Sequence, residues 1–234
     1  MLTLIIATRN PHKVQEIRAI LGERLTFMTL NDFPGAPTVI EDAPTFAGNA
    51  TKKALELARW IAGLPNAQKL SSAEPFVLAD DSGLVVDALN GAPGVHSARF
   101  AALDTGVAGN SSDTDNKAKL LRLMQSIPTE QRTARFRCVI ALTPILPSHA
   151  EPKSPVCYAD ELELATRLFE GSCEGRIGFE PKGHAGFGYD PLFIPDGFAE
   201  TFAQLGETTK NRISHRAKAL AAVKIGTRLG TITF

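Results

Sequence analysis

Two adjacent carboxylates in this 234-residue sequence, Asp80 and Asp81, have a residue type and spacing that could bind a metal ion. Asp80 and Asp81 directly follow residues 76–79, an apolar run typical of a short buried strand. Burying a charged side chain there costs free energy unless a nearby cation neutralises it. Mg²⁺ is the natural candidate, because it takes oxygen ligands and often uses one or two carboxylates plus substrate phosphates. Residues 80–83 could equally form a polar turn, since Asp, Ser and Gly favour turns, and the motif alone leaves both interpretations open.

A second acidic pair, Glu41 and Asp42, precedes a predicted helix that starts near residue 45. A carboxylate at this position could supply another metal ligand. Acidic residues in front of a helix more often complement its dipole, so this pair alone does not decide between the two roles.

The polar residues 8–13 follow a short apolar run and begin a helical pattern. Asn10 suits the N-cap and Pro11 the first helical position. A helix N-terminus offers unpaired N–H groups and partial positive charge that favour a phosphate, and Arg9 and Lys13 add charge. The spacing matches neither a Walker loop nor a dinucleotide fingerprint. A capped helix with surface charges is the simpler alternative.

Two further groups lie near the C-terminus. Residues 183–191 combine closely spaced glycines with Phe187 and Tyr189; glycine lets backbone approach a ligand, and an aromatic ring can stack on a base. Residues 210–216 gather donors that could contact phosphate oxygens or a base carbonyl. The alternatives are a packed loop and a solvated basic turn. Taken together, the groups indicate a nucleotide ligand.

The elements that must position these groups alternate between strands and helices. Apolar and alternating runs predict strands, whereas apolar residues at helical spacing predict helices. The expected strands are residues 2–7, 76–79, 84–89, 134–142 and 156–168, and the expected helices are residues 11–21, 45–61, 116–125 and 211–224. Residues 91–112 and 175–197 are expected to be turn-rich or loop-like. This interleaving favours an α/β protein with a mixed sheet.

Composition narrows the function classes. With 25 basic and 25 acidic residues, the net charge of +0 offers no electrostatic footprint for nucleic acid or an anionic membrane. No segment approaches the ~20 apolar residues of a membrane span. The three cysteines lack Cys-x-x-Cys spacing, which favours reduced thiols in the cytoplasm. The N-terminus lacks the basic flank of a signal peptide. We therefore expect a cytoplasmic protein with no nucleic-acid or membrane partner.

The order of these motifs resembles the inosine triphosphate pyrophosphatase family, which hydrolyses non-standard purine nucleoside triphosphates. The matching segments are residues 7–13, 45–46, 49–50, 53–54, 79–84, 91–95, 97–99, 135–136, 138–139, 186–191 and 214–216. The resemblance implies an elongated α/β fold of two lobes around a long mixed sheet with flanking helices, with the active-site cleft between the lobes. It also implies a homodimer that requires Mg²⁺. The implied reaction converts inosine, deoxyinosine or xanthosine triphosphate (ITP, dITP, XTP) to the monophosphate and pyrophosphate, which cleanses the nucleotide pool.

The resemblance further implies roles for individual residues. Asp81 matches the family's catalytic carboxylate and metal ligand, and Glu41 matches a second metal ligand. The implied substrate-binding residues are Thr8, Arg9, Asn10, Pro11, His12, Lys13, Ser82, Phe187, Gly188, Tyr189, Asp190, Lys210, His215 and Arg216.

Residues 1–234 are expected to form a single nucleoside triphosphate pyrophosphatase domain. Near residues 144–155, repeated proline opposes both helix and central strand, so an exposed Pro-rich insert is expected.

Three alternatives remain. A pyrophosphatase for modified pyrimidine or methylated nucleotides should lack the combined motifs at residues 80–83 and 214–216. A nucleotide sensor without turnover should have lost an acidic residue, yet Glu41, Asp80 and Asp81 are all present. A nucleic-acid-binding module is disfavoured by the neutral charge and by only two tyrosines.

Overall fold

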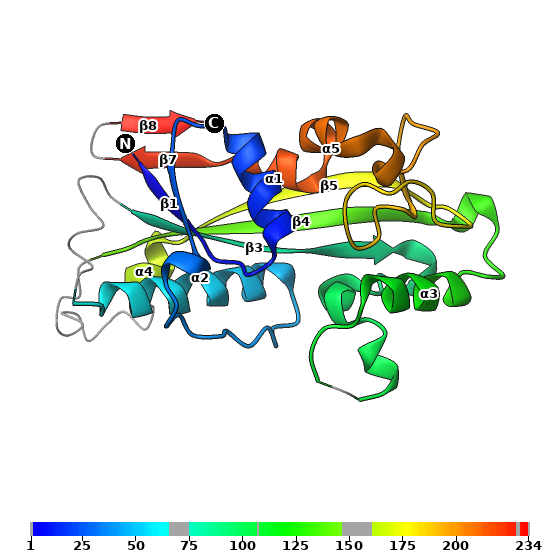
Figure 1. Ribbon diagram of the computed structural model, residues 1–234, viewed down its shortest axis with the longest axis horizontal. Coiled ribbons are helices and arrows are strands. Elements are labelled where there is room, and N and C mark those ends of the chain that lie inside the picture. The colour runs from blue at the N-terminus through cyan, green and yellow to red at the C-terminus, as the bar shows by residue number, and fades with distance from the viewer. Residues whose placement is uncertain (1, 66–74, 107, 147–160, 228–229, 234) are drawn as a thin grey trace. The chain divides into compact units, whose positions relative to one another are not determined.

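The computed structural model describes residues 2–65, 75–106, 108–146, 161–227 and 230–233 (Figure 1). Within them, six strands form one mixed sheet in the order β2-β1-β3-β4-β5-β6, and two more strands form a separate antiparallel hairpin. The strands are β1 (Thr3–Ile6), β2 (Thr26–Thr29), β3 (Phe76–Val86), β4 (Thr133–Pro144), β5 (Arg167–Ile177), β6 (Phe193–Pro195), β7 (Lys224–Thr227) and β8 (Gly230–Thr233). The helices are α1 (Pro11–Leu21), α2 (Phe46–Ala62), α3 (Asp113–Leu123), α4 (Glu161–Ala165), α5 (Phe202–Ile213) and α6 (His215–Ala221). This architecture confirms the predicted α/β class with a mixed sheet and flanking helices.

The chain divides into two compact units. The first comprises Met1–Asp81, Val139–Phe169 and Leu220–Phe234, and the second comprises Ser82–Cys138 and Glu170–Ala219. Strands β3, β4 and β5 each contribute residues to both units. The single pyrophosphatase domain expected over residues 1–234 stays a prediction.

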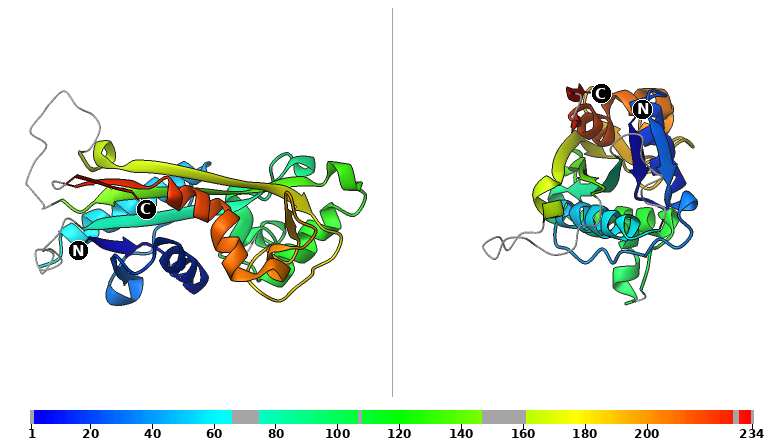
Figure 2. Two further views of the ribbon diagram at one scale, coloured as in Figure 1. Left: turned by 90° about the horizontal axis from the view of Figure 1, so that it is seen from above. Right: turned by 90° about the vertical axis from the view of Figure 1, so that its left-hand side faces the viewer.

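In the first unit, α1 and α2 must cover opposite faces of the sheet. β1 pairs in parallel with both β2 and β3, so α1 connects β1 to β2 in one direction and α2 returns over β1 to β3. Because parallel crossovers are right-handed, the reversal of direction moves the second helix to the other face. Figures 1 and 2 show α1 and α2 on different sides of β1 and β3. The buried face of α2 carries Ala50, Ala54 and Ala58, all completely inaccessible.

The second unit has an aromatic core. The ring of Phe136 lies 4.8 Å from the Phe193 ring and 6.2 Å from the Phe202 ring, measured between centroids. Leu84 on β3 and Leu120 on α3 are completely buried in the same cluster. This core joins α3, α5 and the second-unit parts of β3 to β5. Of the predicted site residues, Lys210 lies on α5, residues 187–190 follow β5, and residues 215–216 begin α6.

The structure corrects several predicted elements. Residues 80–83 form no turn, because β3 continues through them to Val86. Residues 161–165 are helix α4 rather than strand, and β5 begins at Arg167.

Two corrections concern the C-terminal part. The region 175–197 contains the end of β5 and the whole of β6. Helix α5 was not predicted, since its sequence is polar and Gly206 interrupts it with a left-handed backbone (φ +76°). The final helix starts at His215 and ends at Ala221.

The predicted Pro-rich insert falls mostly outside the described residues. Pro144 is the last residue of β4, so the strand extends further than expected. Residues 147–155 are not among the described residues, and the prediction for them stays open. In the part of the chain that the structure describes, no helix is long and apolar enough to cross a membrane.

Candidate active site

The first group of candidate residues surrounds the carboxyl end of β1. β1 is connected through α1 to its neighbour β2, whereas its other neighbour, β3, is reached from β2 through α2 in the opposite direction. Such a change in the direction of the connections commonly marks a ligand site in an α/β sheet. Ile6 pairs with Leu78 of β3, and the Ala7 N–H donates to the Leu78 carbonyl at 2.8 Å. Residues 8–13 therefore begin where Asp80 and Asp81 continue along β3.

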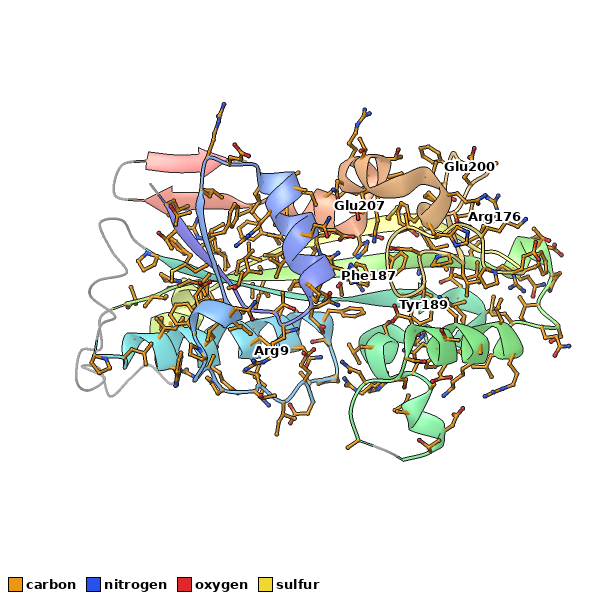
Figure 3. All side chains as sticks on the ribbon, in the orientation of Figure 1. Arg9, Arg176, Phe187, Tyr189, Glu200 and Glu207 are labelled. Atoms are coloured by element: carbon orange, nitrogen blue, oxygen red, sulfur yellow. The ribbon has the colours of Figure 1, made fainter. Side chains whose placement is uncertain are left out.

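The loop before α1 is fixed by its own side chains. Asn10 Oδ1 accepts hydrogen bonds from the N–H groups of His12 at 2.9 Å and Lys13 at 3.3 Å, as its predicted N-cap role requires. Thr8 Oγ1 accepts from the Asn10 N–H at 3.2 Å. Arg9, labelled in Figure 3, donates to the Ala36 carbonyl at 3.1 Å. The N–H groups of His12 and Lys13, expected to be unpaired, are thus already bonded to Asn10. Phosphate binding by this loop stays a prediction, which now depends on the charges of Arg9 and Lys13 and on the helix dipole.

Two lysines neutralise the adjacent carboxylates, which explains why Asp80 and Asp81 can occupy a buried strand. Lys13 Nζ forms an ion pair with Asp80, whose side chain is only 1% exposed. Lys53 Nζ, from α2, lies 3.6 Å from Asp81 Oδ1 and donates to the Asp80 carbonyl at 2.7 Å. Paired charges of this kind can be buried without the penalty of an isolated carboxylate.

Asn49 orients the Asp81 carboxylate. Its Nδ2 donates to Asp81 Oδ2 at 3.1 Å, and its own Oδ1 accepts from the Ala43 N–H at 2.9 Å, which fixes the amide. Burial raises the pKa of Asp81, while the charges of Lys53 and Lys13 lower it and that of Glu41 raises it. The carboxylate is therefore held in one orientation, beside both lysine and glutamate side chains.

Glu41 completes this group, because its Oε2 lies 3.2 Å from the same Lys53 Nζ that contacts Asp81. One ammonium group therefore bridges the two carboxylates predicted to bind a metal. Among the described residues no three His, Cys, Asp or Glu side chains form a metal-binding cluster. Since Mg²⁺ needs only one or two carboxylates when substrate phosphates complete its shell, Glu41 and Asp81 fit that ion. Their role as ligands stays a prediction.

The second group belongs to the second unit and centres on the loop between β5 and β6 (Figure 3). Asp190 Oδ2 accepts from Lys210 Nζ at 2.5 Å and from the Phe187 N–H at 2.9 Å. Lys210 Nζ also lies 4.5 Å from the centroid of the Phe187 ring. At Gly186, with φ +75°, a Cβ would lie 2.2 Å from Asp190 Oδ2, so only glycine fits. The loop thus presents a half-buried aromatic ring beside a buried ammonium group.

Tyr189 is buried in the second-unit core, with 4% of its surface exposed. Its hydroxyl donates to the Ser97 carbonyl at 3.0 Å, and burial together with the nearby Asp113 charge raises its pKa. Gly188 next to it donates its N–H to Asp113 Oδ2 at 2.6 Å. These two residues therefore hold the loop in place, and their contact with substrate stays a prediction.

The last predicted donors lie at the start of α6. Arg216, 1% exposed, donates from Nη2 to Ser82 Oγ at 2.9 Å. The ring of His215 stacks on Phe136 with 4.8 Å between centroids and 14° between planes. The second-unit residues of the predicted site are thus largely buried and held in defined orientations.

Asn49 and Lys53 were not among the site residues predicted from the sequence, although both contact Asp81. Their spacing contained a signal, since residues four apart on a helix share a face. A polar Asn and a Lys on the otherwise apolar face of α2 require buried partners, and two unmatched carboxylates were available.

Comparisons with known proteins agree with these features. The model of the Ham1 family matches residues 4–225. The dITP/XTP pyrophosphatase of Desulforamulus reducens is 46% identical over 228 residues, which cover 97% of this chain and 96% of that protein. The dITP/XTP pyrophosphatase of Shouchella clausii is 42% identical over 221 residues, covering 94% of each. The solved structure of a HAM1 protein from Coxiella burnetii is similar with a TM-score of 0.69 and 34% identity, covering 94% of both chains.

Proposed function

The chain belongs to the Ham1 family, and we propose that it is a Mg²⁺-dependent enzyme that hydrolyses ITP, dITP and XTP to the monophosphate and pyrophosphate. The observation that carries the proposal is the Lys53 ammonium group between Glu41 and Asp81. Two carboxylates that could bind a metal ion therefore lie beside a lysine, and cationic side chains of this kind can bind the phosphates of a nucleotide. The names of the relatives from D. reducens and S. clausii support a pyrophosphatase of non-standard purine nucleotides.

In the proposed reaction, residues of the first unit bind the triphosphate and orient a water molecule. Arg9 and Lys13 bind phosphate oxygens, and Lys13 stabilises the charge that develops on them. Glu41 and Asp81 would hold Mg²⁺, which when bound neutralises phosphate oxygens and lowers the pKa of coordinated water.

Asp81, fixed by Asn49, orients a water molecule toward the α-phosphorus and accepts its proton. The water oxygen bonds to the α-phosphorus, and the bond to the bridging oxygen breaks. Pyrophosphate leaves with that electron pair.

Residues of the second unit are proposed to select the base. Hypoxanthine and xanthine present an acceptor at O6, where adenine presents an amino donor. Lys210, His215 and Arg216 supply donors for O6, and Phe187 supplies a ring on which the base stacks. Adenine would place its own amino donor against these donors, and sites built around a hydrogen bond to the substrate reject the wrong partner by up to ~10⁴–10⁵. ATP is therefore expected to be a poor substrate.

The resemblance extends the proposal to the setting of the enzyme. We propose a cytoplasmic homodimer that removes non-standard purine nucleotides from the nucleotide pool. Light scattering of the purified chain tests the dimer, and a monomer mass at micromolar concentration would contradict it.

Pyrophosphate release from a panel of nucleoside triphosphates tests the function. With Mg²⁺ present, ITP, dITP and XTP should yield pyrophosphate with kcat/KM far above that of ATP, and a chelator should stop the reaction. A preference for modified pyrimidine or methylated nucleotides would assign a different substrate class. Binding of ITP without turnover would identify a sensor instead of an enzyme.

A further inference from the structure

The loop that carries Phe187 is held at its base by backbone hydrogen bonds. The Gly178 N–H donates to the Leu192 carbonyl at 2.7 Å, and the Lys182 N–H donates to the Pro191 carbonyl at 2.8 Å. These bonds close the loop but lie away from its tip. The conformation at Phe187 therefore depends on contacts made by the tip itself.

On one side, the tip is bonded to α5. The Ala185 N–H donates to the Ala203 carbonyl at 3.2 Å, and the Lys210 ammonium group donates to Asp190 at 2.5 Å. The first of these hydrogen bonds joins two backbone groups, and the second joins two side chains already included in the proposed substrate site. They do not hold Gly188, which has a left-handed backbone (φ +60°) directly after Phe187.

On the other side, the tip is bonded to the first turn of α3. Asp113 Oδ2 accepts the Gly188 N–H at 2.6 Å, and a carboxylate is a stronger acceptor than a neutral oxygen. The neighbouring Tyr189 hydroxyl donates to the Ser97 carbonyl at 3.0 Å. Consecutive residues of the tip are thus fixed by a segment that precedes them by more than 70 positions.

The first turn of α3, which carries Asp113, is capped and bonded to the preceding loop. The N-cap Ser112 accepts from the Asp115 N–H at 3.1 Å and donates to Asp115 Oδ2 at 2.6 Å, so Asp115 serves the helix cap. One turn further on, Asn116 accepts from the Ala101 N–H at 2.8 Å and Lys119 donates to the Phe100 carbonyl at 2.7 Å. These contacts tie α3 to the preceding loop and leave Asp113 as the first-turn carboxylate that reaches the glycine loop.

We infer that Asp113 is a positioning residue for the nucleobase site. Its carboxylate holds the Gly188 N–H, which fixes the backbone that presents Phe187 beside the Lys210 ammonium group. The inference rests on the proposed function in that Phe187 is taken as the base-stacking ring. Loss of the contact does not alter the reaction at Asp81. The loop that carries Phe187 would then have to become ordered when substrate binds, and the entropy lost in this step weakens binding. The effect is therefore on KM rather than on kcat.

Three variants of the full-length protein test this role: Asp113→Ala, Asp113→Asn and the matched control Asp115→Ala. With ITP, Asp113→Ala should raise KM roughly tenfold with kcat within about twofold, the size expected for one charge-assisted hydrogen bond. Asp113→Asn keeps an acceptor oxygen and should restore most of the wild-type KM. Asp115→Ala removes a carboxylate from the same helical turn and should leave KM unchanged.

Amide hydrogen exchange without substrate separates this inference from the proposed function. Peptides covering residues 183–192 should exchange faster in Asp113→Ala than in wild type or Asp115→Ala. If wild type does not hydrolyse ITP but this difference is present, the proposed function fails and the positioning contact stands. If exchange in Asp113→Ala equals that of wild type, or if all three variants share one KM, Asp113 has no positioning role. Should Asp113→Ala fail to fold, Asp113→Asn takes its place. Its neutral amide oxygen is a weaker acceptor than a carboxylate, so these peptides should exchange faster than in Asp115→Ala, and equal exchange in the two variants would overturn the inference.

Discussion

Lys53 of α2 and Asp81 of β3 bring their charged groups within 3.6 Å of each other, although 28 positions separate them in the sequence. The same ammonium group lies 3.2 Å from Glu41. A single lysine therefore holds two carboxylates at the carboxyl end of β1, where the strand order reverses. This arrangement explains how a buried strand accommodates Asp81.

Replacing Asp81 by Asn should lower kcat for ITP at least ~100-fold, the lower end for loss of a positioned acid–base group. The amide matches the carboxylate in shape, so the fold should be retained, which circular dichroism can check. Turnover near that of wild type, with chelator still inhibiting, would remove Asp81 from the mechanism.

Glu41→Gln should raise the Mg²⁺ concentration needed for half-maximal activity at least roughly tenfold, because it removes one of the two proposed carboxylate ligands. Asp42→Asn is the matched control, since Asp42 adjoins Glu41 in sequence but pairs with Lys52 at 2.8 Å. A Mg²⁺ titration of both variants measures the difference. Equal curves for the two variants would contradict the assignment of Glu41.

Phe187→Ala should raise KM for ITP by roughly 5- to 150-fold, the equivalent of the ~1–3 kcal/mol that base–aromatic stacking contributes. Phe179→Ala is the control, because Phe179 is 61% exposed and its ring lies 4.2 Å from the Arg132 guanidinium instead. Steady-state kinetics with ITP compare the two. An unchanged KM for Phe187→Ala would exclude stacking on this ring.

Arg135 should stabilise the protein in a pH-dependent manner. A hydrogen bond from Thr133, followed by the Arg135 guanidinium, lowers the pKa of Asp87, and Arg135 also bonds Glu174 at 2.7 Å. Such a carboxylate stabilises the fold above its unfolded pKa, and the stabilisation is lost as the pH falls through the lowered folded pKa.

Arg135→Ala should therefore cost about 1 kcal/mol of unfolding free energy near pH 7, with the difference shrinking below about pH 4; the figure is small because solvent screens these partly exposed groups. Urea unfolding at several pH values measures it. Arg137→Ala, which removes a single exposed pair with Glu170, is the control and should cost less. A cost for Arg135→Ala that does not change with pH would contradict the assignment.

Local sequence patterns were sufficient for the elements with strong caps. Asn10 and Pro11 fixed the start of α1, and Thr45 caps α2 where the pattern placed its beginning. The Asp-Asp-Ser-Gly segment was ambiguous because its turn propensity is local, whereas the pairing of Asp80 with Lys13 and of Asp81 with Lys53 is tertiary. Helix α5 was not predicted because Gly206, with a left-handed backbone, interrupts the helical spacing of its apolar residues.

The same limit applied to the candidate site. Motifs identified the charged and aromatic residues, but the partners that orient them are ordinary polar residues elsewhere in the chain. Asn49 orients Asp81, and Asp113 bonds Gly188 across 75 positions. Such contacts require the folded arrangement of the elements, which no local pattern contains.

The position of water attack on ITP tests the central claim most directly. Hydrolysis in ¹⁸O-enriched water with Mg²⁺ should place the label in inosine monophosphate and release unlabelled pyrophosphate, because the water oxygen bonds to the α-phosphorus. Mass spectrometry of both products gives the answer in one experiment. Label in orthophosphate, with inosine diphosphate accumulating, would show attack at the γ-phosphorus and contradict the proposed reaction.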